Sequence, residues 1–293
     1  MFVLAHLSDI HLAPLPTPPL AELISKRGLG YLNWLRKRRA IHRPEVLAAI
    51  VADLDAQQPD HVAVTGDLVN LSLSNEFAPA RAWLERVGTP ERVTFVPGNH
   101  DAYVRATAGR AVREWAAHMS GDGGETFPFV WRRGPVALVG LSSALPTLPL
   151  AATGRIGGEQ LARLGEVLAA LSREELFRIV LVHHPPTPGV NYFRRLTDAP
   201  ELREVLRKHG AELILHGHLH ASSLIWLSGP RESIPCVGAP SASGSPDHHD
   251  EPAGYNLFEI DGEPGAWHCT TIGRGMHRED GTIGEVGRQS LTD

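Results

Sequence analysis

The sequence is short of cysteine, of long apolar runs and of excess positive charge. Only Cys236 and Cys269 occur, each within a β-like run, so we expect packed thiols and no disulfide framework. No apolar run approaches ~18 residues, which excludes an ordinary transmembrane helix. The 293 residues carry 28 Lys and Arg against 33 Asp and Glu, a formal net charge of −5. This balance argues against a broad nucleic-acid-binding surface, and we expect no specific nucleic-acid partner.

The beginning of the sequence also lacks the pattern of a secretory signal. Met1–His6 has no basic stretch, and the polar pair Ser8 and Asp9 follows almost at once. We therefore predict a cytoplasmic protein. By contrast, histidine is abundant, with sixteen residues against three methionines. Because histidine titrates near neutral pH and binds metals, the positions of these residues need an explanation.

Short apolar runs alternate with helical spacing in the first two thirds of the chain. This alternation predicts an α/β layered core with largely parallel strands. The predicted strands are Phe2–Leu7, His61–Thr65, Arg92–Val96, Val136–Leu141, Phe177–Val182 and Glu212–Leu215, and the predicted helices are Glu45–Leu54, Gly158–Leu171 and Ala199–Lys208.

After Ala221 the pattern changes to strands without helices between them. These runs are Ser222–Leu227, Ser233–Val237, Tyr255–Ile260 and Ala266–Thr271, and they predict an added antiparallel section. From Gly273 the chain is polar and rich in glycine, which predicts an extended or mobile tail. We therefore divide the chain into a single domain, residues 1–272, and a C-terminal tail, residues 273–293.

Five of the predicted strands are followed directly by Asp, Asn or His. Because the carboxyl ends of parallel strands meet at one edge of a sheet, where ligands bind in open α/β folds, we expect these side chains to lie together. They are Asp9 and His11, Asp67, Asn99 with His100 and Asp101, His183 with His184, and His216 with His218 and His220.

The composition of this set points to metal ions. Ionised Asp, neutral His and an Asn oxygen are ligands for Mn, Fe, Zn or Co, and the pattern does not select among them. There are more candidates than the four that one structural zinc needs, which favours two ions ~3.5–4 Å apart that share a carboxylate. Gly66, Gly98 and Gly217 allow the backbone to turn tightly beside the site.

These motifs resemble, in order, those of the calcineurin-like metallophosphoesterase superfamily. The resemblance covers roughly residues 1–225, and the segment from His183 to Gly217 is most like bacterial class III cyclic-nucleotide phosphodiesterases and the related glycerophosphodiesterases. It implies a four-layer αββα sandwich of two mixed β-sheets flanked by helices. It also implies a phosphoric diester hydrolase in which a metal-activated hydroxide attacks phosphorus.

The resemblance assigns a role to each motif residue. Asp9, His11 and His220 would hold one ion, Asn99, His183 and His218 the second, and Asp67 would bridge both. His100 would stabilise a phosphoryl oxygen or protonate the leaving alkoxide, and Asp101 would orient the His100 imidazole. His184 and His216 fall outside the motif positions and are expected to support ligands or to pack.

The substrate is left open between several phosphoesters. The small diesters are a 3′,5′-cyclic nucleotide or a glycerophosphodiester, and the alternatives are a phosphomonoester or a pyrophosphate linked to a lipid or nucleotide sugar. Thr187–Thr197, with Arg194 and Arg195, forms either one wall of the pocket or a solvated loop. The sequence does not fix the oligomeric state, and a dimer is among the options.

Residues 13–43 form a long insertion after the first metal motif. Residues 26–43 contain seven basic residues and no acidic one, with Tyr31, Trp34 and leucines between them. Three interpretations stay open: a cap over an anionic substrate, a peripheral contact with an anionic membrane, or a helix packed on the core. The metal-like run Asp247–Asp250 lies outside every motif, and we expect it to be a surface loop.

Overall fold

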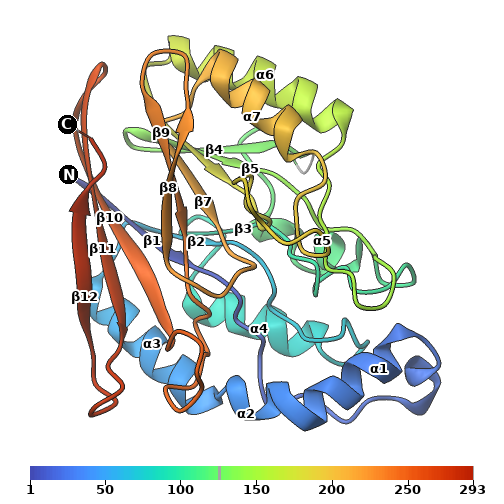
Figure 1. Ribbon diagram of the computed structural model, residues 1–293. Coiled ribbons are helices and arrows are strands. Elements are labelled where there is room, and N and C mark those ends of the chain that lie inside the picture. The colour runs from blue at the N-terminus through green and yellow to red at the C-terminus, as the bar shows by residue number, and fades with distance from the viewer. Residues whose placement is uncertain (125–126, 293) are drawn as a thin grey trace.

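The central strands are apolar on both faces, and each face meets a different core. In β5 (Val136–Gly140), Val136 and Leu138 point into one core while Ala137 and Val139 point into the other. Because side chains alternate along a strand, such a run needs a covering layer on each side. The computed structural model, which describes residues 1–124 and 127–292, has these layers: two sheets packed together with helices outside them (Figure 1). The predicted αββα sandwich is confirmed.

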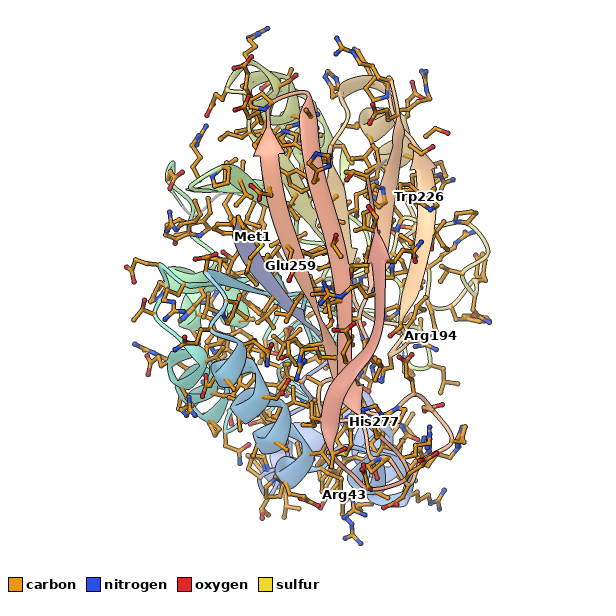
Figure 2. The ribbon with its side chains drawn as sticks, turned by 90° about the vertical axis from the view of Figure 1, so that its left-hand side faces the viewer. Met1, Arg43, Arg194, Trp226, Glu259 and His277 are labelled. Carbon is orange, nitrogen blue, oxygen red and sulfur yellow. The ribbon has the colours of Figure 1, made fainter. Side chains whose placement is uncertain are left out.

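The first sheet has the strand order β12–β11–β10–β1–β2–β3. β1, β2 and β3 are parallel, whereas β10 to β12 run antiparallel to their neighbours. Figure 2 looks onto this sheet, with Glu259 on β10 at the left and Trp226 on β8 of the other sheet at the right. The strands are β1 (Phe2–Leu7), β2 (His61–Val64), β3 (Val93–Phe95), β10 (Gly254–Glu263), β11 (Ala266–Met276) and β12 (Ile283–Ser290).

The second sheet has the strand order β4–β5–β6–β7–β9–β8. β5, β6, β7 and β9 are parallel, and β4 and β8 are antiparallel edge strands. Besides β5, its strands are β4 (Phe129–Arg133), β6 (Phe177–Leu181), β7 (Leu213–His216), β8 (Ser223–Ser228) and β9 (Ser233–Gly238). The strands after Ala221 are therefore divided between the two sheets, and the expected antiparallel section has one exception, because β9 runs parallel to β7.

Amphipathic helices cover the outer faces. In α6 (Gly158–Arg173), Leu161, Leu164, Leu168 and Leu171 recur at helical spacing and pack on the second sheet. α7 (Ala199–His209) packs beside it, and α3 (Pro44–Gln57) and α4 (Phe77–Val87) bury their apolar residues in the core of the first sheet. The remaining helical segments are η1 (Leu20–Leu23), α1 (Lys26–Asn33), η2 (Trp34–Arg38), α2 (Arg39–Ile41), α5 (Arg110–Glu114) and η3 (Ala116–His118).

The segment after Gly273, expected to be an extended or mobile tail, is extended and belongs largely to the first sheet. β11 continues to Met276, and β12 pairs antiparallel with it. β12 is an edge strand whose side chains are largely exposed, so its polar, glycine-rich sequence lacks the apolar alternation by which a strand is predicted. Among the described residues, no helix has both the length and the hydropathy that a membrane span requires.

Candidate metal centre

The motif residues meet where the carboxyl ends of parallel strands from both sheets come together. β1, β2 and β3 belong to the first sheet, and β6 and β7 to the second. The expectation of a single sheet edge was therefore wrong, although the convergence itself is present. The loops after these strands carry all seven predicted ligands, which are Asp9, His11, Asp67, Asn99, His183, His218 and His220.

One group of potential ligand atoms surrounds Asp9. Its Oδ1 lies 3.1 Å from His220 Nε2 and 3.9 Å from His11 Nε2, and these two imidazole nitrogens are 3.3 Å apart. Asp9 Oδ1 is buried and, although His220 Nε2 lies close to it, accepts no well-directed hydrogen bond. A buried carboxylate oxygen without a donor is costly, so this arrangement calls for a cation.

A second group surrounds His183. Its Nε2 lies 3.2 Å from Asn99 Oδ1 and 3.4 Å from Asp67 Oδ2. The His218 ring is 5.1 Å from the His183 ring between centroids, and its buried Nε2 has no hydrogen-bond partner. Asp67 Oδ2 is also 3.8 Å from His11 Nε2, so this carboxylate stands between the two groups.

Backbone groups hold the ligand side chains in their orientations. His183 Nδ1 lies 2.6 Å from the carbonyl oxygen of Thr65, which turns Nε2 towards the centre. The His218 backbone N–H donates to Asp9 Oδ2 at 2.8 Å, which leaves Oδ1 facing His220. Such supporting hydrogen bonds fix the tautomer and angle of metal ligands.

The backbone at the site is held in a strained conformation. Non-glycine residues with positive φ cost about 1–3 kcal/mol each and cluster at functional sites. Five of the seven predicted ligands have one: Asp9 (52°), His11 (42°), Asp67 (58°), His218 (70°) and His220 (55°). Packing of the neighbouring turns on each other sustains this strain, since the Asp9 and His11 backbone N–H groups donate to the carbonyls of Gly66 and Asp67.

Two glycines are required because no room remains for a side chain. A Cβ on Gly98 would lie 2.2 Å from Asp67 Oδ1, and one on Gly217 would lie 1.7 Å from Ser8 Oγ. Both distances are far below van der Waals contact. Only glycine therefore lets the backbone approach these side chains so closely.

Charge interactions keep most ligands in a protonation state that binds metal. Burial raises the pKa of the Asp9 and Asp67 carboxyls, but nearby histidines, chiefly His220 and His183, hold both below their ordinary values. Burial, followed by Arg38, lowers the pKa of His11 well below its usual value. His183 differs. Burial lowers its pKa, but the nearby carboxylates, chiefly Asp67, outweigh burial and raise the pKa to about 9. A cation would therefore have to displace a proton there.

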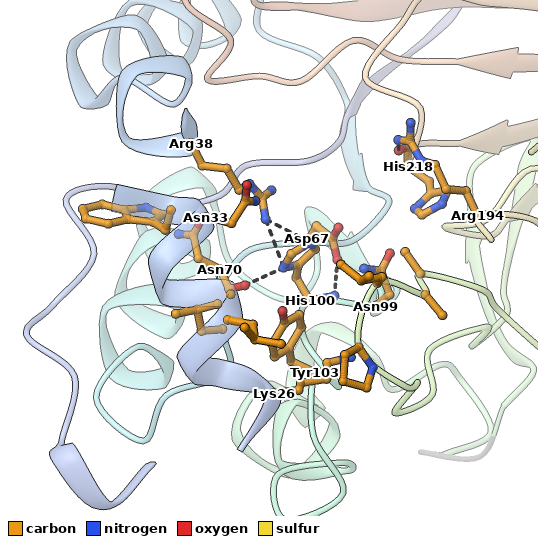
Figure 3. Close-up of a pocket in the computed structure, with 18 of the residues that line it drawn as sticks. Lys26, Asn33, Arg38, Asp67, Asn70, Asn99, His100, Tyr103, Arg194 and His218 are labelled. Carbon is orange, nitrogen blue, oxygen red and sulfur yellow. Dashed lines mark hydrogen bonds between the residues drawn. The ribbon is translucent and has the colours of Figure 1, made fainter. Parts of the chain in front are cut away.

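A cavity of about 450 Å³ opens over this centre. Figure 3 shows Arg38, Asn33 and Asn70 on one side of it, Arg194 and His218 on the other, and Asp67 and His100 between them. Lys26 Nζ donates to the carbonyl oxygen and Oγ1 of Thr147, both at 3.1 Å, which connects α1 to the loop on the facing side. The lining of the floor comprises Asp67, Asn99, His100, His218 and His220.

Comparison with known families identifies this arrangement. The calcineurin-like phosphoesterase family matches residues 2–222, about three quarters of the chain. The chain belongs to this family. As a metallophosphoesterase it has the donor set that divalent cations need, and the partnerless Asp9 Oδ1 and His218 Nε2 agree with that requirement.

Two relatives of this phosphoesterase are named probable cyclic nucleotide phosphodiesterases. One, from Synechococcus sp., is 29% identical over 226 residues, which cover 75% of this chain and 79% of the relative. The other, from Rhodococcus erythropolis, is 29% identical over 246 residues, covering 82% and 72%.

Solved phosphatase structures share the fold. A dimetal phosphatase from Danio rerio has a TM-score of 0.66 at 15% identity and covers 99% of this chain and 98% of its own. A purple acid phosphatase from yellow lupin has a TM-score of 0.60 at 15% identity, covering 97% of this chain and 52% of its own.

Asp101 does not orient the His100 ring of this phosphoesterase as expected. Its carboxylate instead accepts the backbone N–H groups of Asp67 (2.7 Å), Leu68 (3.0 Å) and Gly98 (2.8 Å). It therefore fixes the turn that carries Asp67. The His100 ring is held by the Asn70 carbonyl oxygen, 2.5 Å from Nδ1, and stacks on Tyr103. Burial, followed by Arg38, lowers the pKa of His100 to about 3, so the ring is neutral near pH 7.

Sequence reasoning missed Arg38, which it counted only as one basic residue in the insertion. Arg38 Nη2 lies 2.8 Å from His11 Nε2, and Nη1 lies 3.0 Å from His100 Nε2. Arg38 ends the π-helical turn η2, a rare conformation that is frequent at functional sites. Among the described residues it forms no direct ion pair with a carboxylate. Nothing in the local sequence distinguishes it from Arg36 or Arg39.

His42 was also missed. Its ring lies 4.5 Å from the His11 ring between centroids, and its Nδ1 lies 2.8 Å from Ser243 Oγ. His184 belongs to the His183 group by position, but its two ring nitrogens face Ser143 Oγ and the Ala152 carbonyl oxygen. His216 is buried behind its strand end. His184 and His216 are thus buried beside the ligand groups, in positions that suit residues that support metal ligands.

The structure decides part of what the sequence left open. α1 and η2 of the insertion line the cavity, so this segment is one of its walls. Arg194 also lines the cavity and donates to the His218 carbonyl oxygen, whereas the Arg195 guanidinium lies over the Tyr192 ring. The run Asp247–Asp250 is a surface loop, as predicted, although three of its side chains cluster like ligands.

Proposed function

We propose that this metallophosphoesterase is a dinuclear phosphodiesterase that hydrolyses a small phosphodiester, either a 3′,5′-cyclic nucleotide or a glycerophosphodiester. The observation that carries the proposal is the position of Asp67. Its Oδ2 lies 3.8 Å from His11 Nε2 in one ligand group and 3.4 Å from His183 Nε2 in the other. A carboxylate shared in this way is typical of two-metal phosphoryl-transfer sites.

The assignment of ligands follows the two groups. Asp9, His11 and His220 would hold one ion, Asn99, His183 and His218 the other, and Asp67 both. When bound, divalent ions at such a site supply a water nucleophile that is deprotonated near neutral pH. Mn, Fe, Zn and Co all accept these ligands.

Arg38 and His100 would act on the substrate's phosphate. Arg38 Nη2 lies beside His11 Nε2, the atom that would bind an ion, and it lacks a carboxylate partner there. It would therefore leave His11 when metal is present, and a phosphoryl oxygen is the acceptor that it would take instead. His100, with its Nδ1 directed at the Asn70 carbonyl, presents Nε2 to the cavity. In the neutral ring Nε2 carries no proton, so it would first take one up when the negative charge of the phosphate arrives and would then pass it to the leaving oxygen.

A diester is favoured by the relatives and by the size of the cavity. Both relatives described above are named probable cyclic nucleotide phosphodiesterases. A cavity of about 450 Å³ has room for much more than a phosphate group.

The test is hydrolysis of bis(4-nitrophenyl) phosphate and 3′,5′-cyclic AMP by the Mn²⁺-loaded enzyme. We expect Asp67→Ala and Asn99→Ala to abolish activity, because each removes a ligand of the proposed centre. His249→Ala, in the exposed loop, is the control and should retain activity. Equal hydrolysis by a sample stripped of metal would contradict the proposal.

A phosphomonoesterase, or a pyrophosphatase acting on a lipid- or nucleotide-sugar-linked substrate at a membrane surface, is the second candidate. The cavity has three cationic side chains, Lys26, Arg38 and Arg194, which would suit a second phosphate. A substrate panel that adds phosphomonoesters and nucleotide-linked pyrophosphates separates these activities. Sedimentation with anionic vesicles, with and without charge reversal at the exposed Arg36, Lys37 and Arg39, tests the membrane contact.

A further inference from the structure

The mouth of the cavity carries apolar side chains that are open to solvent. Leu29 in α1 is 59% exposed and Leu150 in the facing loop is 96% exposed, and both line the cavity. Single exposed leucines are ordinary on protein surfaces, but here two segments far apart in sequence place them at one opening.

The apolar surface continues away from the opening on both sides. Leu32 lies one turn after Leu29 on the same face of α1 and is exposed, and Leu148 is 79% exposed two residues before Leu150. Leu150 has φ of 68°, a conformation that a leucine rarely adopts. The bonds from Lys26 Nζ to Thr147 hold the two segments together.

The interior of the same cavity has the opposite character. Arg38 lies beside His11 and His100, Lys26 lies over the Tyr103 ring, and Arg194 lies beside His218. Arg38 and Arg194 therefore lie near the floor, where a phosphate would lie, while the leucines surround the entrance. The charge suits one end of a ligand, and the aliphatic surface suits the other.

We propose that the substrate is an amphiphilic phosphoester whose alkyl or acyl chain lies along Leu29 and Leu150 while its phosphate lies on the cavity floor. This inference rests on the proposed phosphodiesterase chemistry, and it replaces the two small diesters named above with a diester that carries an aliphatic chain. A nucleobase would fit the rim less well, because its polar ring edges would meet aliphatic side chains.

The experiment uses the Mn²⁺-loaded full chain and two diesters that differ only in chain length, methyl and octyl 4-nitrophenyl phosphate, below the concentration at which the octyl ester aggregates. In each, water adds its oxygen to phosphorus, the bond to 4-nitrophenolate breaks, and the alkyl phosphate is the second product. We expect kcat/KM to be at least tenfold higher for the octyl ester. Burial of about two methylene groups on the rim is enough for a tenfold difference.

Matched variants locate the effect. The double variant Leu29→Ser/Leu150→Ser should reduce the octyl-to-methyl ratio at least fivefold. Leu20→Ser, at an exposed leucine that does not line the cavity, should leave the ratio unchanged. A wild-type ratio near one, with cyclic AMP hydrolysed efficiently, would overturn the apolar rim and leave the diesterase function standing.

Binding tests the rim without turnover. Calorimetry should show that octyl phosphate binds at least tenfold more tightly than ethyl phosphate, and the double variant should lose this difference. If no diester is hydrolysed but the preference in binding persists, the proposed function fails and the rim assignment stands. Equal affinities for the two alkyl phosphates would overturn the rim assignment.

Discussion

At the scale of single residues, hydrogen bonds and close packing from the surrounding backbone fix the orientation of the side chains in the site. Asp67 has one oxygen fixed by the His100 backbone N–H at 2.7 Å, which leaves Oδ2 directed at the histidines. Gly98 packs against the same carboxylate. Arg38 contributes the positive charge nearest to both His11 and His100.

Replacing Arg38 should impair turnover more than metal binding. We expect Arg38→Ala to lower kcat/KM for a diester about ten- to hundredfold, which corresponds to the loss of a charge-assisted hydrogen bond. Arg38→Lys should recover only part of this loss, because an ammonium lacks the planar fork. The measurements are steady-state kinetics and metal content. Arg36→Ala, an exposed neighbour, is the control, and an Arg38→Ala enzyme with normal kcat/KM would exclude the assignment.

Gly98→Ala should disrupt the centre. The added Cβ would meet Asp67 Oδ1 at 2.2 Å, so the carboxylate or its turn must move. We expect a loss of bound metal and of activity, and a decrease of about 1–3 kcal/mol in the free energy of unfolding, typical of overpacking. Gly123→Ala is the matched control, since a Cβ there has no neighbour within 4 Å. Metal content and urea unfolding are measured for both variants. A Gly98→Ala enzyme with the metal content and stability of Gly123→Ala would contradict the prediction.

At the scale of elements, a polar cluster joins α3 to the antiparallel part of the first sheet. Asp53 in α3 accepts hydrogen bonds from Arg274 Nε and Nη2 and from the Tyr255 hydroxyl, all at 2.7 Å. Burial raises the pKa of Asp53, but Arg274 and Tyr255 lower it below the ordinary value. The cluster ties β10 and β11 to a helix that follows the insertion.

Asp53→Asn should therefore destabilise the fold in a pH-dependent way. At pH 7 we expect the free energy of unfolding to fall by about 1–3 kcal/mol. A carboxyl with a lowered pKa stabilises the fold above its unfolded pKa of about 4, and this stabilisation is lost as pH falls through the folded value. The difference between wild type and variant should be constant from pH 7 to 5 and shrink below about pH 4 in urea titrations. An undiminished difference at pH 3 would contradict it.

At the scale of the whole molecule, metal binding connects the two sheets. The candidate ligands follow β1, β2 and β3 of one sheet and β6 and β7 of the other, and each ion would take ligands from both sheets. Such an ion would bind only the folded chain. The insertion closes over this junction and forms one wall of the cavity. Metal occupancy and global stability should be linked for this reason.

Metal removal should consequently lower the melting temperature. At a metal concentration 100 times the dissociation constant, binding adds about 2.7 kcal/mol to the stability of the folded state. We expect a chelator to lower the Tm by several degrees, and Mn²⁺ to restore it in differential scanning calorimetry. In Asp67→Ala the same treatment should change the Tm little. A wild-type Tm that does not respond to chelation would count against a metal that links the sheets.

Much of this protein follows from its sequence alone. The apolar runs predicted the central strands, and the leucine spacing in 158–171 predicted α6, because both patterns are local. The residues at the strand ends lie together as expected, because parallel strands bring their carboxyl ends together within each sheet, but the meeting of two sheets was not predicted. β12 and the role of Asp101 were not predicted, because an exposed edge strand has no apolar period and Asp101 bonds to backbone groups more than thirty residues away.

The tertiary structure alone decided which parts of the insertion matter. Its seven basic residues are alike in sequence, yet Arg38 reaches the metal ligands, Arg27 is buried against the carbonyls of Leu71 and Ser72, and Arg36 is exposed. The direction of a side chain depends on where its helix packs and on the extra residue in the π-helical turn. The spacing of apolar residues in the sequence predicts neither. The apolar rim is likewise a product of docking, because Leu29 and Leu150 meet only in the folded chain.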